Sequence, residues 1–214
     1  EKSYNKTTLS DLGEEPLKTL ELMYVENLPI WMPDVHEWRL PQNLWHVFRL
    51  IPYVSLLMRH DRNLYVYLTA QHTFVPKSSI QRRPGWHADG FGSDDINVIW
   101  YDSTPTEFAV QDFPDGIDDH HELSMIDMDR QVREDCIRTY PTGTLLMIDE
   151  RMIHRPAVQE EAGFRRFIKF TISRHKANMA GNAHNYLFEY AWEMTPRDIG
   201  KRNNPGTTYT TGKL

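Results

Sequence analysis

Three side chains that can bind a metal ion are distinguished by their types and spacing. His87 and Asp89 are two positions apart, and in an extended segment such side chains point the same way. His154 follows an expected strand that ends at Ile148, so it can approach the pair from a second strand. Two imidazoles and one carboxylate form the facial triad that binds non-haem iron and leaves adjacent positions open. We expect His87, Asp89 and His154 to hold one Fe(II) ion and to be the catalytic residues.

The segments that must position these ligands are mostly short and rich in strand-forming residues. Gly85, Gly90 and Gly92 flank the first two ligands and allow the backbone to bend there. Alternating or β-branched runs predict strands at 64–75, 97–101, 106–110, 132–140, 143–148 and 166–173.

The remaining segments are expected to be helix, coil or loop. Helical spacing of apolar residues predicts helices at 14–25, 44–58 and 187–194. The second of these helices should break near Pro52, and packed coil is expected at 29–41. The acidic stretch 112–127 is expected to be a solvated loop, and its role, including that of a lid, is left open. His120 and His121 in this loop are the alternative candidates for metal binding.

Composition and charge limit the class of protein. The 214 residues are 40% hydrophobic and 25% charged, which is ordinary for a soluble globular protein. A formal charge of −6 disfavours a nucleic-acid partner without excluding one. The single cysteine, Cys136, favours a cytoplasmic location, and the sequence has neither an apolar run of about 18 residues nor a signal-like start. We therefore expect no membrane span.

The ligand pattern continues into the last strand and resembles a known family. His87-x-Asp89, then His154, then Gly163-Phe164-Arg165 is similar to the Fe(II)/2-oxoglutarate-dependent dioxygenases, including their phytanoyl-CoA hydroxylase-like and prolyl hydroxylase-like branches. The resemblance covers roughly residues 65–173.

The resemblance implies how the co-substrate is bound. An arginine of the last strands pairs with the distal carboxylate of 2-oxoglutarate, and its planar fork suits a bidentate contact. Arg165 and Arg166 are both candidates, and only one of them can point inward; Arg165 is favoured. Tyr101, on a strand expected to flank the iron, is a further candidate for co-substrate binding.

The resemblance also implies the fold. We expect a mainly β protein with flanking helices: a double-stranded β-helix, that is, a jelly-roll or cupin-like barrel with an N-terminal helical buttress. A single dioxygenase domain over 1–214 is expected, with a helical cover at 1–62, the β-helix core at 63–175, and a C-terminal helix and tail at 176–214.

The implied function is an oxygenase that uses Fe(II), 2-oxoglutarate and O2, forms succinate and CO2, and hydroxylates a substrate. Asp89 favours hydroxylation, because halogenating members of the family typically lack this carboxylate. A small molecule is the expected substrate, while its identity and the oligomeric state are not indicated. Two alternatives are a cupin-like metalloenzyme that does not use 2-oxoglutarate, which would not need Arg165, and a catalytically silent ligand-binding barrel.

Overall fold

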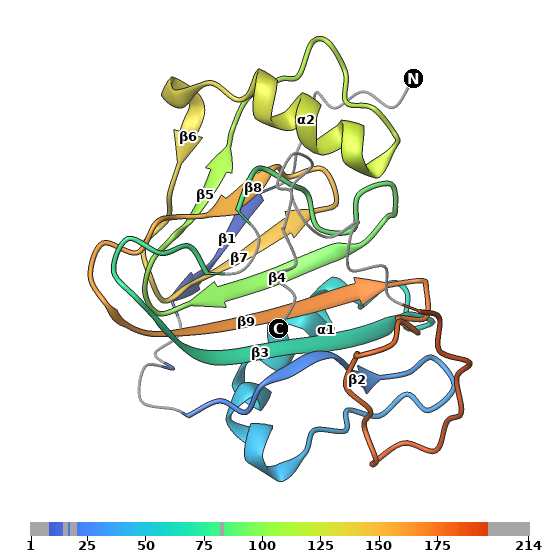
Figure 1. Ribbon diagram of the computed structural model, residues 1–214. Helices are drawn as coiled ribbons and strands as arrows, with labels where there is room; N and C mark the ends of the chain where they lie inside the picture. The colour runs from blue at the N-terminus through green and yellow to red at the C-terminus, as the bar shows by residue number, and fades with distance from the viewer. Residues whose placement is uncertain (1–8, 15–16, 18–20, 82–83, 197–214) are drawn as a thin grey trace, which may run out of the picture.

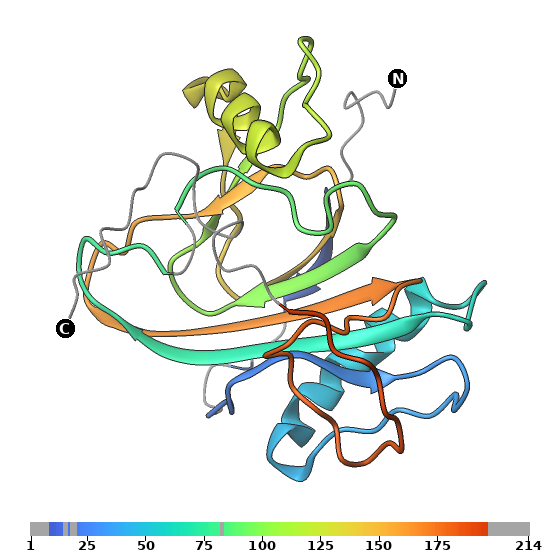
Figure 2. The ribbon, with the colours of Figure 1, turned by 45° about the vertical axis from the view of Figure 1, so that its right-hand side comes forward.

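The computed structural model describes residues 9–14, 17, 21–81 and 84–196, and it is mainly β, with two antiparallel sheets. The larger sheet has the strand order β1-β7-β4-β9-β3-β2, and the smaller sheet has the order β6-β5-β8. The larger sheet comprises β1 (Leu9–Glu14), β7 (Thr144–Asp149), β4 (Ile96–Tyr101), β9 (Gly163–Ser173), β3 (Tyr65–Val75) and β2 (Val25–Trp31). The smaller sheet comprises β6 (Ile137–Arg138), β5 (Thr106–Ala109) and β8 (His154–Pro156). In Figures 1 and 2 the smaller sheet lies on one side of the larger, and α1 lies on the other.

The long strands β3 and β9 form the centre of the larger sheet. They pair along their whole length, from Tyr65 opposite Ser173 to Val75 opposite Gly163. Because strand side chains alternate between faces, β9 has two different surfaces. Its even-numbered residues Ile168, Phe170 and Ile172 are buried in the main hydrophobic cluster, together with residues of α1 and β2.

The odd-numbered residues of β9 project to the opposite face, toward the smaller sheet. Phe167 packs there against a cluster that includes Phe108 of β5 and Tyr101 of β4. Arg165 and Lys169 share this face with Phe167, two residues away on either side. The interior between the sheets is therefore lined by two basic side chains of one strand.

The expected break near Pro52 is confirmed. The 3-10 helix η1 (Gln42–Leu50) leads directly into the α-helix α1 (Ile51–Leu57), and Pro52 lies in the first turn of α1, where its missing N–H has no intrahelical partner to lose. In η1 every third residue is buried, which matches the three residues per turn of a 3-10 helix: Leu44, Val47 and Leu50.

The other N-terminal expectations are wrong in part. Over its described residues the segment 14–25 is not helical, since Glu14 ends β1 and Val25 begins β2. The coil expected at 29–41 begins only after Trp31, because β2 includes Pro29. An edge strand tolerates a proline, and β2 is an edge strand. The N-terminal helical buttress is therefore not confirmed as a whole.

The acidic stretch 112–127 is not simply a loop. Its second half belongs to helix α2 (His121–Gln131), which buries Met125 and Met128 at i and i+3 on one side. The i, i+3 spacing of the two methionines is typical of a helix, but the charged residues around them favoured the prediction of a loop. Met128 joins a buried cluster with Trp86, so α2 packs on the outside of the ligand-bearing loop (Figure 1).

Five of the six expected strands are found, and the sixth is not. The strands at 64–75, 97–101, 106–110 and 143–148 correspond to β3, β4, β5 and β7, and the strand expected at 166–173 begins three residues earlier as β9. The stretch 132–140 contains only the short 3-10 helix η2 (Glu134–Cys136) and the two-residue β6.

The C-terminal helix expected at 187–194 is also wrong. Its apolar stripe is not buried, since Leu187 is 49% and Met194 44% exposed. Asn185 instead fixes an irregular segment, because its Nδ2 donates to Pro29 O and Arg39 O at 2.7 and 2.9 Å. Among the described residues, no helix has the length and apolar character needed to cross a lipid bilayer.

Candidate metal centre

The backbone places two of the candidate ligands directly opposite each other. The His87 N–H donates to His154 O at 3.0 Å, and the His154 N–H donates to His87 O at 2.8 Å. This antiparallel bridge joins the loop that carries His87 to β8. Residues paired in this way have side chains on the same face of a sheet, and the two imidazole centroids are 4.7 Å apart.

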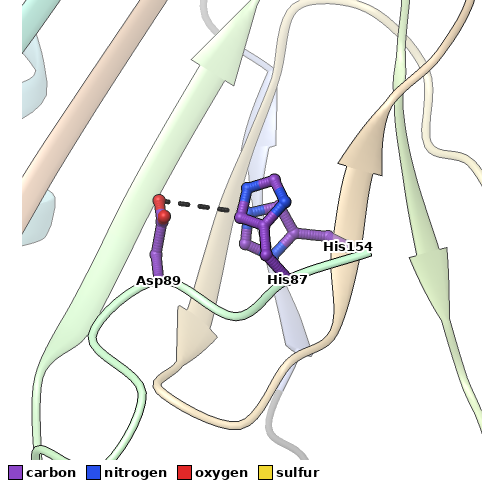
Figure 3. Close-up of side chains that lie close together, drawn as sticks. All are labelled: His87, Asp89 and His154. Carbon is purple, nitrogen blue, oxygen red and sulfur yellow. Dashed lines mark ion pairs between the residues drawn. The ribbon is translucent and has the colours of Figure 1, made fainter. Parts of the chain in front are cut away.

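Asp89 completes the group from the same loop (Figure 3). One possible ligand atom from each of His87, Asp89 and His154 lies within 4.8 Å of the other two. The distance from Asp89 Oδ2 to His154 Nε2 is 3.9 Å. Asn97 of β4 donates its Nδ2 to Asp89 O at 3.4 Å, which ties the loop to the larger sheet. Among the described residues, no other set of three His, Cys, Asp or Glu side chains is placed to hold a metal ion, so His120 belongs to no such group.

The loop bends at the glycines that flank the ligands. Gly85, Gly90 and Gly92 all have positive φ, where the backbone was expected to bend. At Gly90, with φ of +78°, an added Cβ would lie 3.0 Å from Asp95 Cβ and from Ser93 Oγ. Glycine is needed there both for its backbone conformation and for space.

Hydrogen bonds to the backbone orient both imidazoles. His87 Nδ1 is 3.0 Å from Gly85 O, and His154 Nδ1 is 2.8 Å from Met152 O. A carbonyl oxygen can only accept, so both Nδ1 atoms carry the proton and donate it. Each Nε2 then carries the lone pair of its ring, and metal-binding histidines are usually held in this way.

The charge states of the group also suit a cation. Burial lowers the pKa of His154 below its ordinary value, although the Asp89 carboxylate acts in the opposite direction, so the imidazole is neutral. Burial would raise the pKa of Asp89, but Lys169 and then His154 and His87 outweigh it and hold that pKa well below its usual range. The group therefore offers a neutral His154 imidazole and an ionised Asp89 carboxylate beside the His87 imidazole.

A cation–π contact on the outer side joins the two ligand-bearing segments. Trp86, which precedes His87, is buried in a hydrophobic cluster with Ile153. The Arg155 guanidinium lies 4.4 Å from the centre of the Trp86 ring, and its Nε donates to Glu107 Oε2 at 2.6 Å. Trp86 thus fills the core behind the ligands.

Arg165 is buried between several acceptors at one end of the interior face of β9. The residue is 4% exposed. Its Nε donates to Ser103 O at 3.1 Å and Thr104 O at 3.0 Å, and its Nη1 donates to Gln81 Oε1 at 2.5 Å. Gln81 Nε2 is buried and, within the described part of the chain, has no hydrogen-bond partner.

Arg166 projects from the opposite face and is committed to another partner. Its Nη1 lies 2.7 Å from Asp102 Oδ2, and its backbone N–H donates to Asp102 Oδ1 at 2.8 Å. The two neighbouring arginines are therefore separated by the strand, and only Arg165 shares a face with Lys169.

The Tyr101 side chain lies beside Arg165 but directs its hydroxyl elsewhere. The guanidinium carbon is 5.5 Å from the centre of the Tyr101 ring. The hydroxyl donates to Tyr140 O at 3.3 Å, and burial raises the pKa of Tyr101 to about 12. Tyr101 thus contacts Arg165 through its ring and keeps its proton.

Sequence reasoning missed Lys169 and Gln81. Lys169 Nζ lies 2.6 Å from Asp89 Oδ2, in direct contact with a candidate ligand. The alternation of Arg165, Phe167 and Lys169 along β9 was a usable signal, because it places both cations on one face once Arg165 is taken as inward. Gln81 comes from the link between β3 and the ligand loop and offered no such signal.

The sequence matches no protein-family model and no curated protein. Similar solved structures include EvdO2 from Micromonospora carbonacea var. aurantiaca, which is 14% identical to this chain with a TM-score of 0.35. The match covers 58% of this chain and 64% of EvdO2, less than two thirds of the length of EvdO2. AviO1 from Streptomyces viridochromogenes Tue57 is 13% identical with a TM-score of 0.44, covering 80% of this chain and 91% of that one. An oxidoreductase of the 2OG-Fe(II) oxygenase family from Burkholderia pseudomallei is 13% identical with a TM-score of 0.32, covering 78% and 74%. At these TM-scores the likenesses carry no weight for the function of this chain.

Proposed function

We propose that this chain is an Fe(II)- and 2-oxoglutarate-dependent oxygenase that hydroxylates a small molecule. The observation that carries the proposal is the arrangement of His87, Asp89 and His154, whose ligand atoms lie within 4.8 Å of one another. Two imidazoles and one carboxylate on one side of an ion form a facial triad, which leaves adjacent positions open.

The donor set fits Fe(II) in detail. Both Nδ1 atoms donate to backbone carbonyls, so the lone pair of each ring is on Nε2, the atom that would bind the ion. Asp89 supplies the negative charge, and its low pKa keeps it ionised. His87, Asp89 and His154 would hold the metal, with the loop and β8 fixed by their paired backbone hydrogen bonds.

The surroundings of Arg165 fit the distal carboxylate of 2-oxoglutarate. Arg165 is four residues from Lys169 on the same strand face, a separation of about 13 Å between Cα atoms. Two long side chains together with a five-carbon diacid can span that separation. Gln81 adds a buried amide donor that lacks a partner among the described residues, and a carboxylate is an acceptor that would satisfy it. This subsite distinguishes the proposal from a cupin-like enzyme that does not use 2-oxoglutarate.

The chain's own residues would orient the reactants and exclude water. When bound, iron and 2-oxoglutarate would supply the oxidising chemistry, using O2 and releasing succinate and CO2. Arg165 would hold the co-substrate at its far end, and the Tyr101 and Phe167 rings, at 5.5 and 5.2 Å, would keep the guanidinium in place. The apolar cluster of Phe108, Phe167 and their neighbours would keep water from that end of the site.

The strand pairing supports a double-stranded β-helix. The His87 bridge to β8 extends the smaller sheet to the order β6-β5-β8-His87 segment. We propose that this extended sheet and the larger sheet form the two walls of a cupin-like barrel, with the metal centre between them.

The test is turnover of 2-oxoglutarate without added substrate. Protein supplied with Fe(II), 2-oxoglutarate and O2 should release succinate slowly, and His154→Ala should abolish this release. His175→Ala is a matched control, because His175 is 72% exposed and its side chain lies outside the metal group. Succinate release that is equal in wild type and His154→Ala would contradict the proposal.

A further inference from the structure

Lys169 places a positive charge where the proposed metal ion would also lie. Its Nζ is 2.6 Å from Asp89 Oδ2, and the same oxygen is 3.9 Å from His154 Nε2. The Lys169 side chain is only 18% exposed, so water screens it poorly. A divalent ion held by Asp89 would therefore have an ammonium group as a close neighbour. The ammonium group and the metal ion would both contact the Asp89 carboxylate, and like charges this close repel strongly when they are partly buried.

A bound anion would relieve this repulsion. A carboxylate that binds the metal carries negative charge to the same position, and it can accept a hydrogen bond from the ammonium group. The structure would then favour the metal and the anion together over the metal alone.

Gln71 is a second observation that points to an anion at this position. It is 2% exposed, and its Nε2 has no hydrogen-bond partner in the described part of the chain. The register of β3 against β9 pairs Thr69 with Lys169 and Gln71 with Phe167. Gln71 is therefore a diagonal neighbour of Lys169, and equally of Arg165, on the interior face, and long side chains can bridge such a diagonal separation. An ammonium and an unsatisfied amide donor line the same face.

We propose that Lys169, assisted by Gln71, couples metal binding to the binding of a metal-bound carboxylate. Without the anion, Lys169 pairs with Asp89 and opposes the metal ion. With the anion, Lys169 and Gln71 donate to its carboxylate. The identity of that anion as 2-oxoglutarate rests on the proposed function. Because coupling between two ligands is reciprocal, the metal and the anion each tighten the other's binding by one common factor.

The experiment measures that factor with Mn(II) as the metal. Mn(II) affinity is determined by titration under three conditions: without an added anion, with saturating oxalate, and with saturating 2-oxoglutarate. The affinities are corrected for complexes that form in solution. Oxalate has carboxylates for the metal but no distal arm for Arg165, so it isolates the subsite at Lys169. The variants are Lys169→Met, which removes the charge at similar length, and Lys169→Arg, which retains it. Lys77→Met is the matched control, since Lys77 is 61% exposed and pairs with Glu161.

The expected result has two parts. Lys169→Met should bind Mn(II) alone more tightly than wild type, and its coupling factor for oxalate should fall by about tenfold or more, within the usual range of coupling between sites. Lys169→Arg should retain most of the coupling, and Lys77→Met should match wild type. Weaker Mn(II) binding by Lys169→Met with an unchanged coupling factor would overturn the proposal, because Lys169 would then only hold Asp89.

The 2-oxoglutarate titration separates this inference from the proposed function. If oxalate coupling depends on Lys169 while 2-oxoglutarate does not bind, the role of Lys169 stands and the proposed co-substrate is wrong. If Lys169→Met does not fold, Gln71→Leu tests the same subsite with the Lys169–Asp89 pair intact. That variant should lower the coupling factor and leave Mn(II) binding alone unchanged, and an unchanged factor would contradict the proposal.

Discussion

Exchanging the neighbouring arginines of β9 for methionine should separate fold stability from co-substrate binding. Arg166→Met would leave the Asp102 carboxylate without its ion-pair partner, in a pair whose side chains are 19% and 7% exposed. Removing one partner of a buried pair costs about 3–5 kcal/mol. Asp102 keeps two donors, the backbone N–H of residue 166 at 2.8 Å and the Ser103 hydroxyl at 3.3 Å, so the lower end of that range applies. In a chain of this size, a loss of about 3 kcal/mol lowers the melting temperature by roughly 6–12 °C.

Arg165→Met should have a different effect. It removes hydrogen bonds to Ser103 O, Thr104 O and Gln81 Oε1, and it removes the proposed partner of the distal carboxylate. Loss of a charge-assisted bidentate contact worth about 3 kcal/mol weakens binding roughly 100-fold. Arg165→Lys keeps the positive charge but loses the planar guanidinium that makes a bidentate contact. Its affinity for 2-oxoglutarate should lie between those of Arg165→Met and wild type.

The assay is calorimetric titration of the Mn(II)-loaded variants with 2-oxoglutarate, combined with thermal unfolding followed by circular dichroism. Arg166→Met should melt earlier and bind 2-oxoglutarate like wild type, and the double variant Arg166→Met/Asp102→Asn should recover most of the lost stability because no unpaired charge remains. If Arg166→Met loses 2-oxoglutarate affinity while Arg165→Met retains it, the assignment of the two strand faces is refuted.

Three further substitutions test the support around the metal centre. Gly90→Ala should destabilise the ligand loop and weaken Mn(II) binding, because φ is +78° and the new Cβ would lie 3.0 Å from Asp95 Cβ; equal Mn(II) affinity would contradict this. Arg155→Met removes the 4.4 Å contact with Trp86 and should weaken Mn(II) binding several-fold, whereas unchanged titrations would show that this contact does not position the ligands. Burial raises the pKa of Asp95, so the stability that its protonated form provides at low pH is lost as pH rises through the raised pKa. Asp95→Asn should therefore melt higher than wild type at pH 7–8, by a margin that shrinks toward pH 4, and a pH-independent difference between the two melting curves would refute this.

The sequence was most informative where one local pattern determines the structure. Alternation over 64–75 predicted β3. The spacing of His87 and Asp89 was the reason to group them, and possible ligand atoms of the two lie within 4.8 Å of each other. The proline near position 52 marked the junction of two helical segments. These features depend on neighbouring residues alone.

The rest depended on contacts between distant segments. The 187–194 stretch has helical spacing, but Asn185 ties it to the carbonyls of Pro29 and Arg39, which no local pattern encodes. Lys169 is an ordinary strand residue until the ligand loop brings Asp89 to 2.6 Å from it. Choosing between Arg165 and Arg166 likewise needed the partner strand, because Asp102 pairs with only one of them.

The proposed function requires His87, Asp89 and His154 to bind one iron ion that 2-oxoglutarate then chelates. Anaerobic titration with Fe(II), followed by 2-oxoglutarate, tests it most directly through the visible charge-transfer absorption of a 2-oxo acid bound to iron. Wild type should bind one Fe(II) per chain and develop this absorption on addition of 2-oxoglutarate. His87→Ala, Asp89→Ala and His154→Ala should each lose both signals. Unchanged iron binding and absorption in any of the three variants would contradict a metal centre formed by these three residues.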